Sequence, residues 1–140
     1  MIIIVCVDDK LGMAFNHRRQ SMDVLLRKKV LDHCKGHKIW MKPYTAKQFE
    51  SDGQMQNIMV DEDYLNKAAT SDFAFVETDS ILPFYERIQG IILFRWNRTY
   101  PADTYLKIPG TSSDWEISIL DEFEGKSHKK ITMEFWRKLG

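Results

Sequence analysis

Two runs of apolar residues constrain the fold of this chain more than any other feature. Ile2–Val7 and residues 91–94 are apolar at every position, whereas a strand with one solvent-exposed face is apolar at every second position. Such runs are typical of central strands in a parallel sheet that is covered on both faces. Neither run approaches the roughly 20 residues that cross a bilayer. Asp8 and Asp9 follow the first run where a signal peptide would have a small-residue cleavage site, so we expect no signal peptide.

Strand and helix patterns alternate along the rest of the chain. Residues 38–41 and Phe73–Val76 have the pattern of further strands. Short helices are expected at residues 45–49 and 62–68, and a helical turn is expected from Pro83 to Ile88. The alternating segments Trp115–Phe123 and 130–136 are joined by a short polar link and predict an antiparallel hairpin.

The longest predicted helix follows residues 16–20, which have the composition of a polar loop. Ser21 is expected to cap the start of this helix, and Gly36 is expected to close its end. Its apolar positions approximate one helical face: Met22, Leu25, Leu26, Val30 and Leu31.

This order of elements predicts an α/β domain of three layers. Alternating strands and helices build a mostly parallel sheet, and the final hairpin makes that sheet mixed. With 140 residues and 44% hydrophobic residues, the chain has the size and apolar content of a single domain, residues 1–140.

The net charge of the chain excludes a strong general attraction to anionic partners. Its 20 basic and 20 acidic residues cancel, so we expect no membrane binding, and nucleic acid only through the basic N-terminal third. The two cysteines, Cys6 and Cys34, fit a reducing compartment, so a cytoplasmic location is expected.

Several short motifs together resemble dihydrofolate reductase, and their order matches over most of the chain. The closest match lies in the C-terminal third, where Ala102-Asp103-Thr104-Tyr105-Leu106 is similar to the Gly-Asp-Thr-x-Phe stretch of that family. The other matching segments are Val7-Asp8-Asp9-Lys10-Leu11-Gly12, Ser21-Met22-Asp23, Trp40-Met41 with Thr45, Val60-Asp61-Glu62, Asp114-Trp115-Glu116, Glu122-Phe123 and Ser127-His128.

The resemblance implies a dihydrofolate-reductase-like three-layer fold, NADPH as cofactor and a pterin-like substrate. It implies a catalytic role for Asp23, since an acid at this place in the family hydrogen-bonds the pterin ring and assists its protonation. Phe94 stands where the family has a Thr that contacts the pterin through this acid. An alternative reading makes Asp23 a structural acid at the start of a helix, favoured by the helix dipole and capping.

The chain departs from the family pattern where the cofactor would bind. Glu77-Thr78 replaces a Gly-Gly pair that lets the cofactor pyrophosphate approach backbone amides, and a carboxylate there repels phosphate. In the segment that matches Gly-Arg-x-Thr, Thr45 is kept, Pro43 takes the Arg position, and Lys42 is the nearest substitute cation. Lys42, Thr45 and Thr78 are therefore the candidate cofactor-binding residues.

The predicted loop at residues 16–20 is the most concentrated polar cluster. His17-Arg18-Arg19 replaces the Leu-Pro-Trp of the mobile active-site loop of the family. Asn16, His17, Arg18 and Arg19, with Phe94, are the candidate substrate-binding residues. A His beside two Arg also suits RNA binding or metal-free RNA cleavage, with the His as acid or base beside phosphate-binding charge.

The chain also resembles short clostridial proteins labelled ribonuclease Z. That label implies a His-x-His-x-Asp-His zinc motif. The four histidines, His17, His33, His37 and His128, never have this spacing, and no metal site is expected.

Three functional hypotheses follow, in order of preference. The first is a dihydrofolate-reductase-like domain that has lost reductase chemistry and binds a small molecule or a protein partner. The second is an atypical NAD(P)H-dependent reductase of a pterin-like substrate that uses Asp23. The third is RNA binding or ribonuclease activity through His17, Arg18 and Arg19. Whether the chain is an enzyme stays open at this point.

Overall fold

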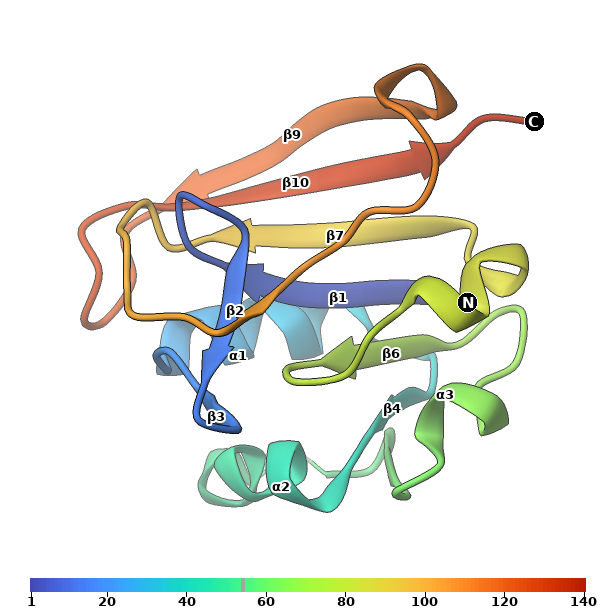
Figure 1. The fold of residues 1–140 in the computed structure, drawn as a ribbon. Helices are drawn as coiled ribbons and strands as arrows, with labels where there is room; N and C mark the ends of the chain where they lie inside the picture. The colour runs from blue at the N-terminus through green and yellow to red at the C-terminus, as the bar shows by residue number, and fades with distance from the viewer. Residues whose placement is uncertain (54) are drawn as a thin grey trace.

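The computed structural model describes residues 1–53 and 55–140 and is built around one seven-stranded sheet (Figure 1). The pairings from β5 to β7 are parallel, and β10 runs antiparallel to both β7 and β9. The structure therefore confirms an α/β fold with a mostly parallel mixed sheet and a C-terminal antiparallel hairpin. Across the sheet the strands are β5 (Ile58–Val60), β4 (Ile39–Met41), β6 (Phe73–Val76), β1 (Ile2–Val7), β7 (Gly90–Arg95), β10 (Ile131–Lys138) and β9 (Trp115–Phe123).

The first strand lies at the centre of this sheet, as its continuous apolar run predicts. Ile4 pairs with Phe75 of β6 on one side and with Ile92 of β7 on the other. Ile3 and Val5 point into the core on one face of the sheet, and Ile4 points into the core on the other face. Burial of both faces explains why this strand shows no alternation of apolar and polar residues.

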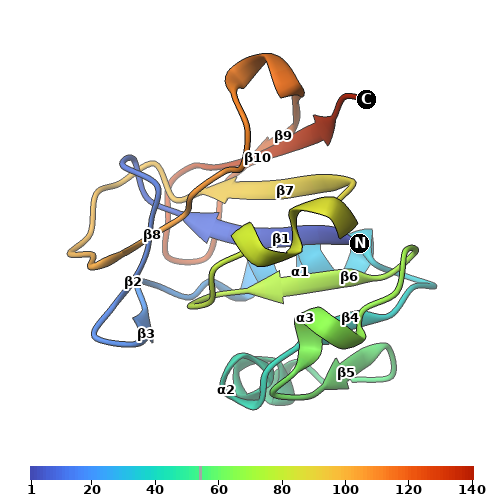
Figure 2. The same ribbon diagram turned by 45° about the vertical axis from the view of Figure 1, so that its right-hand side comes forward.

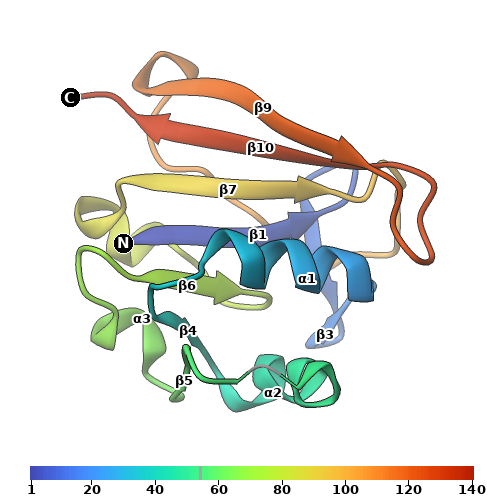
Figure 3. The ribbon, with the colours of Figure 1, turned by 180° about the vertical axis from the view of Figure 1, so that it is seen from behind.

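One face of the sheet is covered by helices (Figure 3). The helix α1 (Val24–His33) packs Leu26 and Val30 into the cluster that contains Ile4 and Ile92. The short helix α2 (Pro43–Ala46) continues into the 3₁₀ helix η1 (Lys47–Asp52), which contributes the fully buried Phe49 to the same core.

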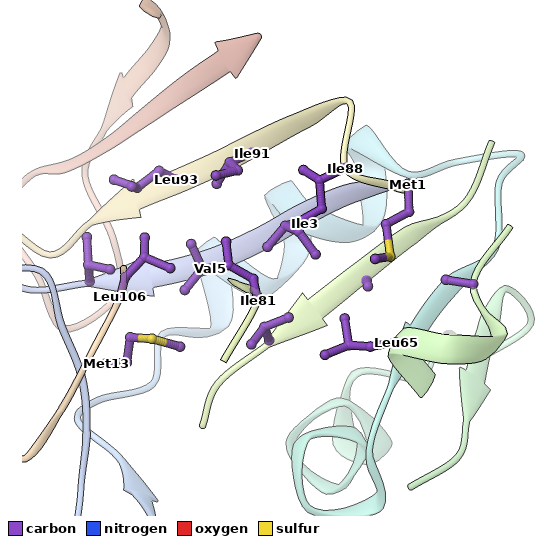
Figure 4. Packing of buried hydrophobic residues seen from close by; sticks show 14 of the residues in the cluster. Met1, Ile3, Val5, Met13, Leu65, Ile81, Ile88, Ile91, Leu93 and Leu106 are labelled. Atoms are coloured by element: carbon purple, nitrogen blue, oxygen red, sulfur yellow. The ribbon is translucent and has the colours of Figure 1, made fainter. Parts of the chain in front are cut away.

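The opposite face is covered by short elements rather than by long helices (Figures 2 and 4). They are the helix α3 (Tyr64–Lys67), the 3₁₀ helix η2 (Leu82–Arg87) and a small sheet of order β3-β2-β8. Their apolar side chains pack on Ile3, Val5, Ile91 and Leu93 and include Leu65, Ile81, Ile88, Met13 and Leu106. The predicted third layer is therefore present, but it is thin.

The small sheet was not predicted. Its strands are β3 (Arg18–Arg19), β2 (Gly12–Phe15) and β8 (Thr104–Tyr105). The prediction of a polar loop at residues 16–20 is therefore wrong for Arg18 and Arg19. Asn16 and His17 form the two-residue turn between β2 and β3, with φ of 51° and 61°. Positive φ at both central residues is typical of a type I′ turn, whose twist matches that of the two strands.

The boundaries of α1 also differ from the prediction. Ser21 does not cap this helix: Asp23 is the N-cap residue, and its carboxylate accepts the amides of Leu25 and Leu26. The helix ends at His33, and Gly36 adopts a left-handed φ of 84° in the turn that follows. Ser and Asp have a similar preference for the N-cap position, so the sequence alone does not decide whether Ser21 or Asp23 caps the helix.

The closing strands add an exposed edge to the sheet. The short 3₁₀ helix η3 (Ser112–Asp114) leads into β9, which pairs with β10 alone and shifts register between Met133 and Glu134. Ile117 and Ile119 of β9 are largely exposed. In the part of the chain that the structure describes, no helix is both long enough and apolar enough to cross a membrane.

Gly90 provides a test of the packing between β7 and β10. A Cβ added there would lie 2.6 Å from an atom of the Phe135 ring and 3.1 Å from the carbonyl oxygen of Trp136. We expect Gly90→Ala to lower the free energy of unfolding by about 1–3 kcal/mol, because overpacking forces neighbouring groups apart. Urea unfolding measures this change. Ser118→Ala on the exposed strand β9 is the control, and an equal effect of both substitutions would contradict the proposed clash.

Candidate functional site at the carboxyl edge of the sheet

Polar residues gather where the parallel strands end. Asp8 follows β1, Glu77 follows β6 and Trp96 follows β7, so all three lie at the same edge of the sheet. The link at residues 124–130 reaches this edge too, because β10 is antiparallel to β7 and begins there. Open α/β sheets bind their ligands at this edge, which makes it the candidate site.

A buried ion pair fills the end of β6. The guanidinium of Arg19 donates to Glu77 through two nitrogens, Nε to Oε2 at 2.8 Å and Nη2 to Oε1 at 3.1 Å. The Arg19 side chain is 17% exposed and that of Glu77 is 8% exposed. A bidentate pair with little contact with water is stronger and more directional than a surface ion pair.

Tyr44 holds the same arginine in place from the helix side. The guanidinium of Arg19 lies 4.2 Å from the centre of the Tyr44 ring, and its Nη2 donates to the Tyr44 carbonyl oxygen at 3.1 Å. The Tyr44 hydroxyl in turn accepts the Arg19 amide at 3.0 Å. Beside this cluster only about 10 Å³ remains between Cys6, Ser21 and their neighbours, which is about enough for one water molecule.

Asp23 joins α1 to the link before β10. Its carboxylate accepts the amides of Lys126 at 3.0 Å and Ser127 at 2.9 Å, in addition to the two helix amides. The Asp23 side chain has no exposed surface. Burial alone would raise the pKa of Asp23, but the amides of Lys126 and Ser127, the His128 ring and the Leu25 amide together hold this pKa well below its ordinary value. Asp23 is therefore ionised at neutral pH.

His128 connects this carboxylate to two hydroxyl groups. Its Nδ1 lies 3.1 Å from Asp23 Oδ2, and its Nε2 lies 3.1 Å from Ser21 Oγ and 3.0 Å from the Tyr100 hydroxyl. The imidazole is buried and stacks on the Trp96 indole with ring centres 4.4 Å apart. The structure thus brings together Ser21, His128 and Asp23, which are up to 107 positions apart in the sequence.

Asp8 holds the start of the small sheet against the carboxyl edge of the large sheet. Its carboxylate accepts the amides of Lys10 and Gly12 at 2.8 and 2.7 Å, the amide of Tyr100 at 3.2 Å and the Gln20 side chain at 2.9 Å. Burial would raise the pKa of Asp8, but these donors lower it below its ordinary value. Asp8 thereby positions Gln20, next to Ser21, and Tyr100.

Two of the three candidate cofactor residues meet in the structure. Lys42 Nζ donates to Thr78 Oγ1 at 2.9 Å and lies 3.4 Å from Asp79 Oδ2. The Tyr64 hydroxyl also donates to Asp79, at 2.7 Å. Thr45 is fully buried, and its hydroxyl has no hydrogen-bond partner among the described residues. The positive charge of Lys42 is therefore already balanced by a carboxylate.

The candidate substrate-binding residues do not form one cluster. Arg19 is held by Glu77, whereas His17 and Arg18 are exposed at the hairpin. The Asn16 amide donates to Asp103 at 3.1 Å, which ties the hairpin to the segment before β8. Phe94 is completely buried and packs edge-on against the Phe123 ring.

A groove of about 420 Å³ lies beside the site, between the loop after β6 and the strand β8. Leu82 and Tyr105 line it and are each more than 40% exposed. The remaining lining residues are Met13, Thr78, Asp79, Ser80, Ile81, Asp103, Thr104, Leu106 and Lys107.

Sequence reasoning missed the grouping of Ser21, Tyr100 and His128. The sequence offers Ser21 as a helix cap or as part of a family motif, and His128 as a metal ligand or as part of a family motif. No local pattern signals a contact between residues this far apart. Among the described residues, no group of three or more His, Cys, Asp or Glu side chains is placed to hold a metal ion.

Comparison with known families and curated proteins found no match, so the geometry of the carboxyl edge is the main guide to function. No protein-family model matches the chain, and no curated protein matches its sequence. The resemblance to dihydrofolate reductase and the roles that it implies for Asp23, Lys42, Thr45 and Thr78 therefore stay predictions.

The contacts of Asp23 predict how stability depends on pH. A carboxyl group whose pKa is lowered by folding stabilises the fold above its unfolded pKa, about 3.9, and this contribution is lost as the pH falls below that value. We expect Asp23→Asn to lower the free energy of unfolding at pH 7 by about 2 kcal/mol or more. Asn can still cap the helix, but the substitution removes the negative charge and replaces the buried oxygen that accepts from Ser127 and faces His128 with a donor. Below about pH 4 the difference between Asp23→Asn and the wild type should narrow. Chemical unfolding at several pH values measures this, and a difference that is independent of pH would contradict it.

The ion pair of Arg19 and Glu77 predicts a large coupling between its two members. Glu77→Gln leaves the arginine without a counter-charge in a nearly closed site, so we expect a loss of about 3 kcal/mol in the free energy of unfolding. Combining it with Arg19→Met should recover much of that loss. A double-mutant cycle measured by urea unfolding tests this, and simple additivity of the two single substitutions would contradict it.

Proposed function

We propose that this chain is a dihydrofolate-reductase-like domain that has lost reductase chemistry and acts by binding a small molecule or a protein partner. The observation that carries the proposal is the Arg19–Glu77 pair, which occupies the end of β6. With Tyr44 packed on the arginine, the pocket between Cys6, Arg19 and Ser21 has a volume of about 10 Å³. A nicotinamide or pterin ring needs far more room than one water molecule.

The charges around β6 also disfavour a dinucleotide phosphate. Glu77 and Asp79 place two carboxylates within three residues directly after this strand. Lys42 is the nearest substitute cation, and its ammonium group already contacts Thr78 and Asp79. A phosphate arriving here would meet carboxylates instead of the unpaired amides and cations that bind anions.

Asp23 supports the same proposal against the alternative of an atypical reductase. A general acid must hold a proton and reach its substrate. The Asp23 side chain has no exposed surface and accepts hydrogen bonds from four backbone amides. The amides of Lys126, Ser127 and Leu25 and the His128 ring hold its pKa low. These contacts favour the structural reading of Asp23.

The groove beside β8 is the binding surface of this proposal. It offers the exposed side chains of Tyr105 and Leu82 for apolar contact, and Asp79 and Asp103 for polar contact. Ligand sites commonly combine such an apolar lining with a few polar groups. Because Asp79 is already paired with Lys42 and Lys107 also lines the groove, the charges there favour a neutral ligand with an aromatic or aliphatic part.

Thermal unfolding with added ligands tests the loss of reductase chemistry. We expect no change in Tm with NADPH, NADH, folate or dihydrofolate at millimolar concentration, because a ligand that binds the folded state must raise Tm by mass action. A saturable rise with NADPH, or oxidation of NADPH in the presence of dihydrofolate, would overturn the proposal.

The binding surface is tested separately by NMR. Small aromatic fragments titrated into the ¹⁵N-labelled protein should shift amide signals of residues 78–82 and 103–107, and Tyr105→Ala should weaken these shifts. Ser118→Ala, on the exposed strand β9, is the matched control. Shifts confined to other regions, or shifts unaffected by Tyr105→Ala, would place the binding surface elsewhere.

A further inference from the structure

Three side chains at the carboxyl edge are arranged as nucleophile, base and orienting acid. Ser21 Oγ lies 3.1 Å from His128 Nε2, and His128 Nδ1 lies 3.1 Å from Asp23 Oδ2. Serine hydrolases on unrelated folds share this sequence of contacts, which is recognised by geometry and not by position in the chain.

The surroundings of Asp23 fix the positions of the protons. Because Asp23 is ionised and accepts from every other neighbour, the proton between it and His128 belongs to Nδ1. Nε2 of the neutral ring then carries the lone pair and accepts the Ser21 hydroxyl proton. This is the tautomer that a general base for Ser21 requires.

The imidazole is also held rigidly in this orientation. Trp96 stacks on one face of the His128 ring with an interplanar angle of 26°, and His128 is 7% exposed. The amides of Lys126 and Ser127 bind the same carboxylate that orients the ring. Ser21 by contrast is partly exposed, so a substrate can approach it from solvent.

Tyr100 adds a second hydroxyl at the same nitrogen. Its hydroxyl lies 3.0 Å from Nε2, so in the resting state Ser21 and Tyr100 converge on one lone pair. When Nε2 takes up the serine proton it can no longer accept from Tyr100. The released phenol can then donate its hydrogen bond to another acceptor, and side-chain donors of this kind stabilise oxyanions.

We propose that Ser21 is an activated nucleophile and that the chain hydrolyses small activated esters through Ser21, His128 and Asp23, with Tyr100 as oxyanion donor. Ser21 Oγ forms a bond to the ester carbonyl carbon while its proton passes to Nε2. The bond from that carbon to the leaving oxygen then breaks, and the proton on Nε2 passes to the leaving oxygen. Water attacks the resulting acyl-serine in the same way and releases the acid, which restores all three residues.

The small space beside Ser21 limits the substrate. About 10 Å³ lies between Ser21, Cys6, Gln20 and Trp96, a volume that suits the attacking water. The acyl group must therefore lie on the solvent side of Ser21, and acetyl, a small acyl group, is the simplest probe. This inference is independent of the groove beside β8 and uses neither pterin nor nicotinamide.

Labelling with a fluorophosphonate tests the nucleophile, because this reagent reacts with activated serines and not with ordinary ones. We expect one adduct per chain, which peptide mapping by mass spectrometry assigns to Ser21. Ser21→Ala should abolish the adduct, and His128→Gln should slow labelling at least about 100-fold, the usual contribution of a general base. Ser118→Ala, an exposed serine on β9, should label at the wild-type rate.

Hydrolysis of p-nitrophenyl acetate provides the second readout. We expect a burst of about one nitrophenolate per chain followed by slower turnover, and we expect both to vanish in Ser21→Ala. Thermal unfolding of each variant shows whether it is folded, and Ser21→Ala removes one hydroxyl and should keep Tm within a few degrees. The absence of an adduct in the wild type, an adduct spread over several serines, or Ser21 labelling that survives His128→Gln would each overturn the proposal.

Discussion

The carboxylate of Asp23 is the interaction on which the rest of the carboxyl edge depends. It accepts the first free amides of α1 and the amides of Lys126 and Ser127, two segments about 100 positions apart. The free amides of a helix end and of a loop are thereby satisfied by one carboxylate. Because Gly125 leaves no space for a Cβ, which would lie 2.5 Å from Asp23 Oδ2, the backbone approaches this carboxylate as closely as a glycine allows.

A second constraint is the tight turn between β2 and β3. Asn16 and His17 reverse the chain within two residues, so Arg19 is directed back toward Glu77 at the end of β6. An extended polar loop would leave this arginine in solvent and the edge of the sheet open. The turn and the ion pair of Arg19 with Glu77 together therefore close the end of β6.

The sequence predicts the large sheet well and the carboxyl edge poorly, for a physical reason. Ile2–Val7 and Phe73–Val76 have the predicted bounds because burial of both faces determines their pattern. Trp115–Phe123 also has the predicted bounds, although most of its side chains are exposed, because β-branched and aromatic residues recur along it. The strands β2, β3, β5 and β8 have two to four residues, too few for a periodic pattern to emerge. The contact of Ser21 with His128 depends on how distant segments pack, and the local sequence pattern does not predict such packing.

The Asp23 contacts and the turn between β2 and β3 act on two nearby residues, Ser21 and Arg19, with different consequences. Arg19 and Ser21 are two positions apart, so the turn that directs the arginine into the sheet also sets the path that brings the serine to His128. Arg19 occupies the end of β6, whereas Ser21 stays partly exposed beside the oriented imidazole of His128. The proposed transfer of an acyl group from an ester to Ser21 needs no bound cofactor ring, and it uses the proton positions that Asp23 imposes on His128.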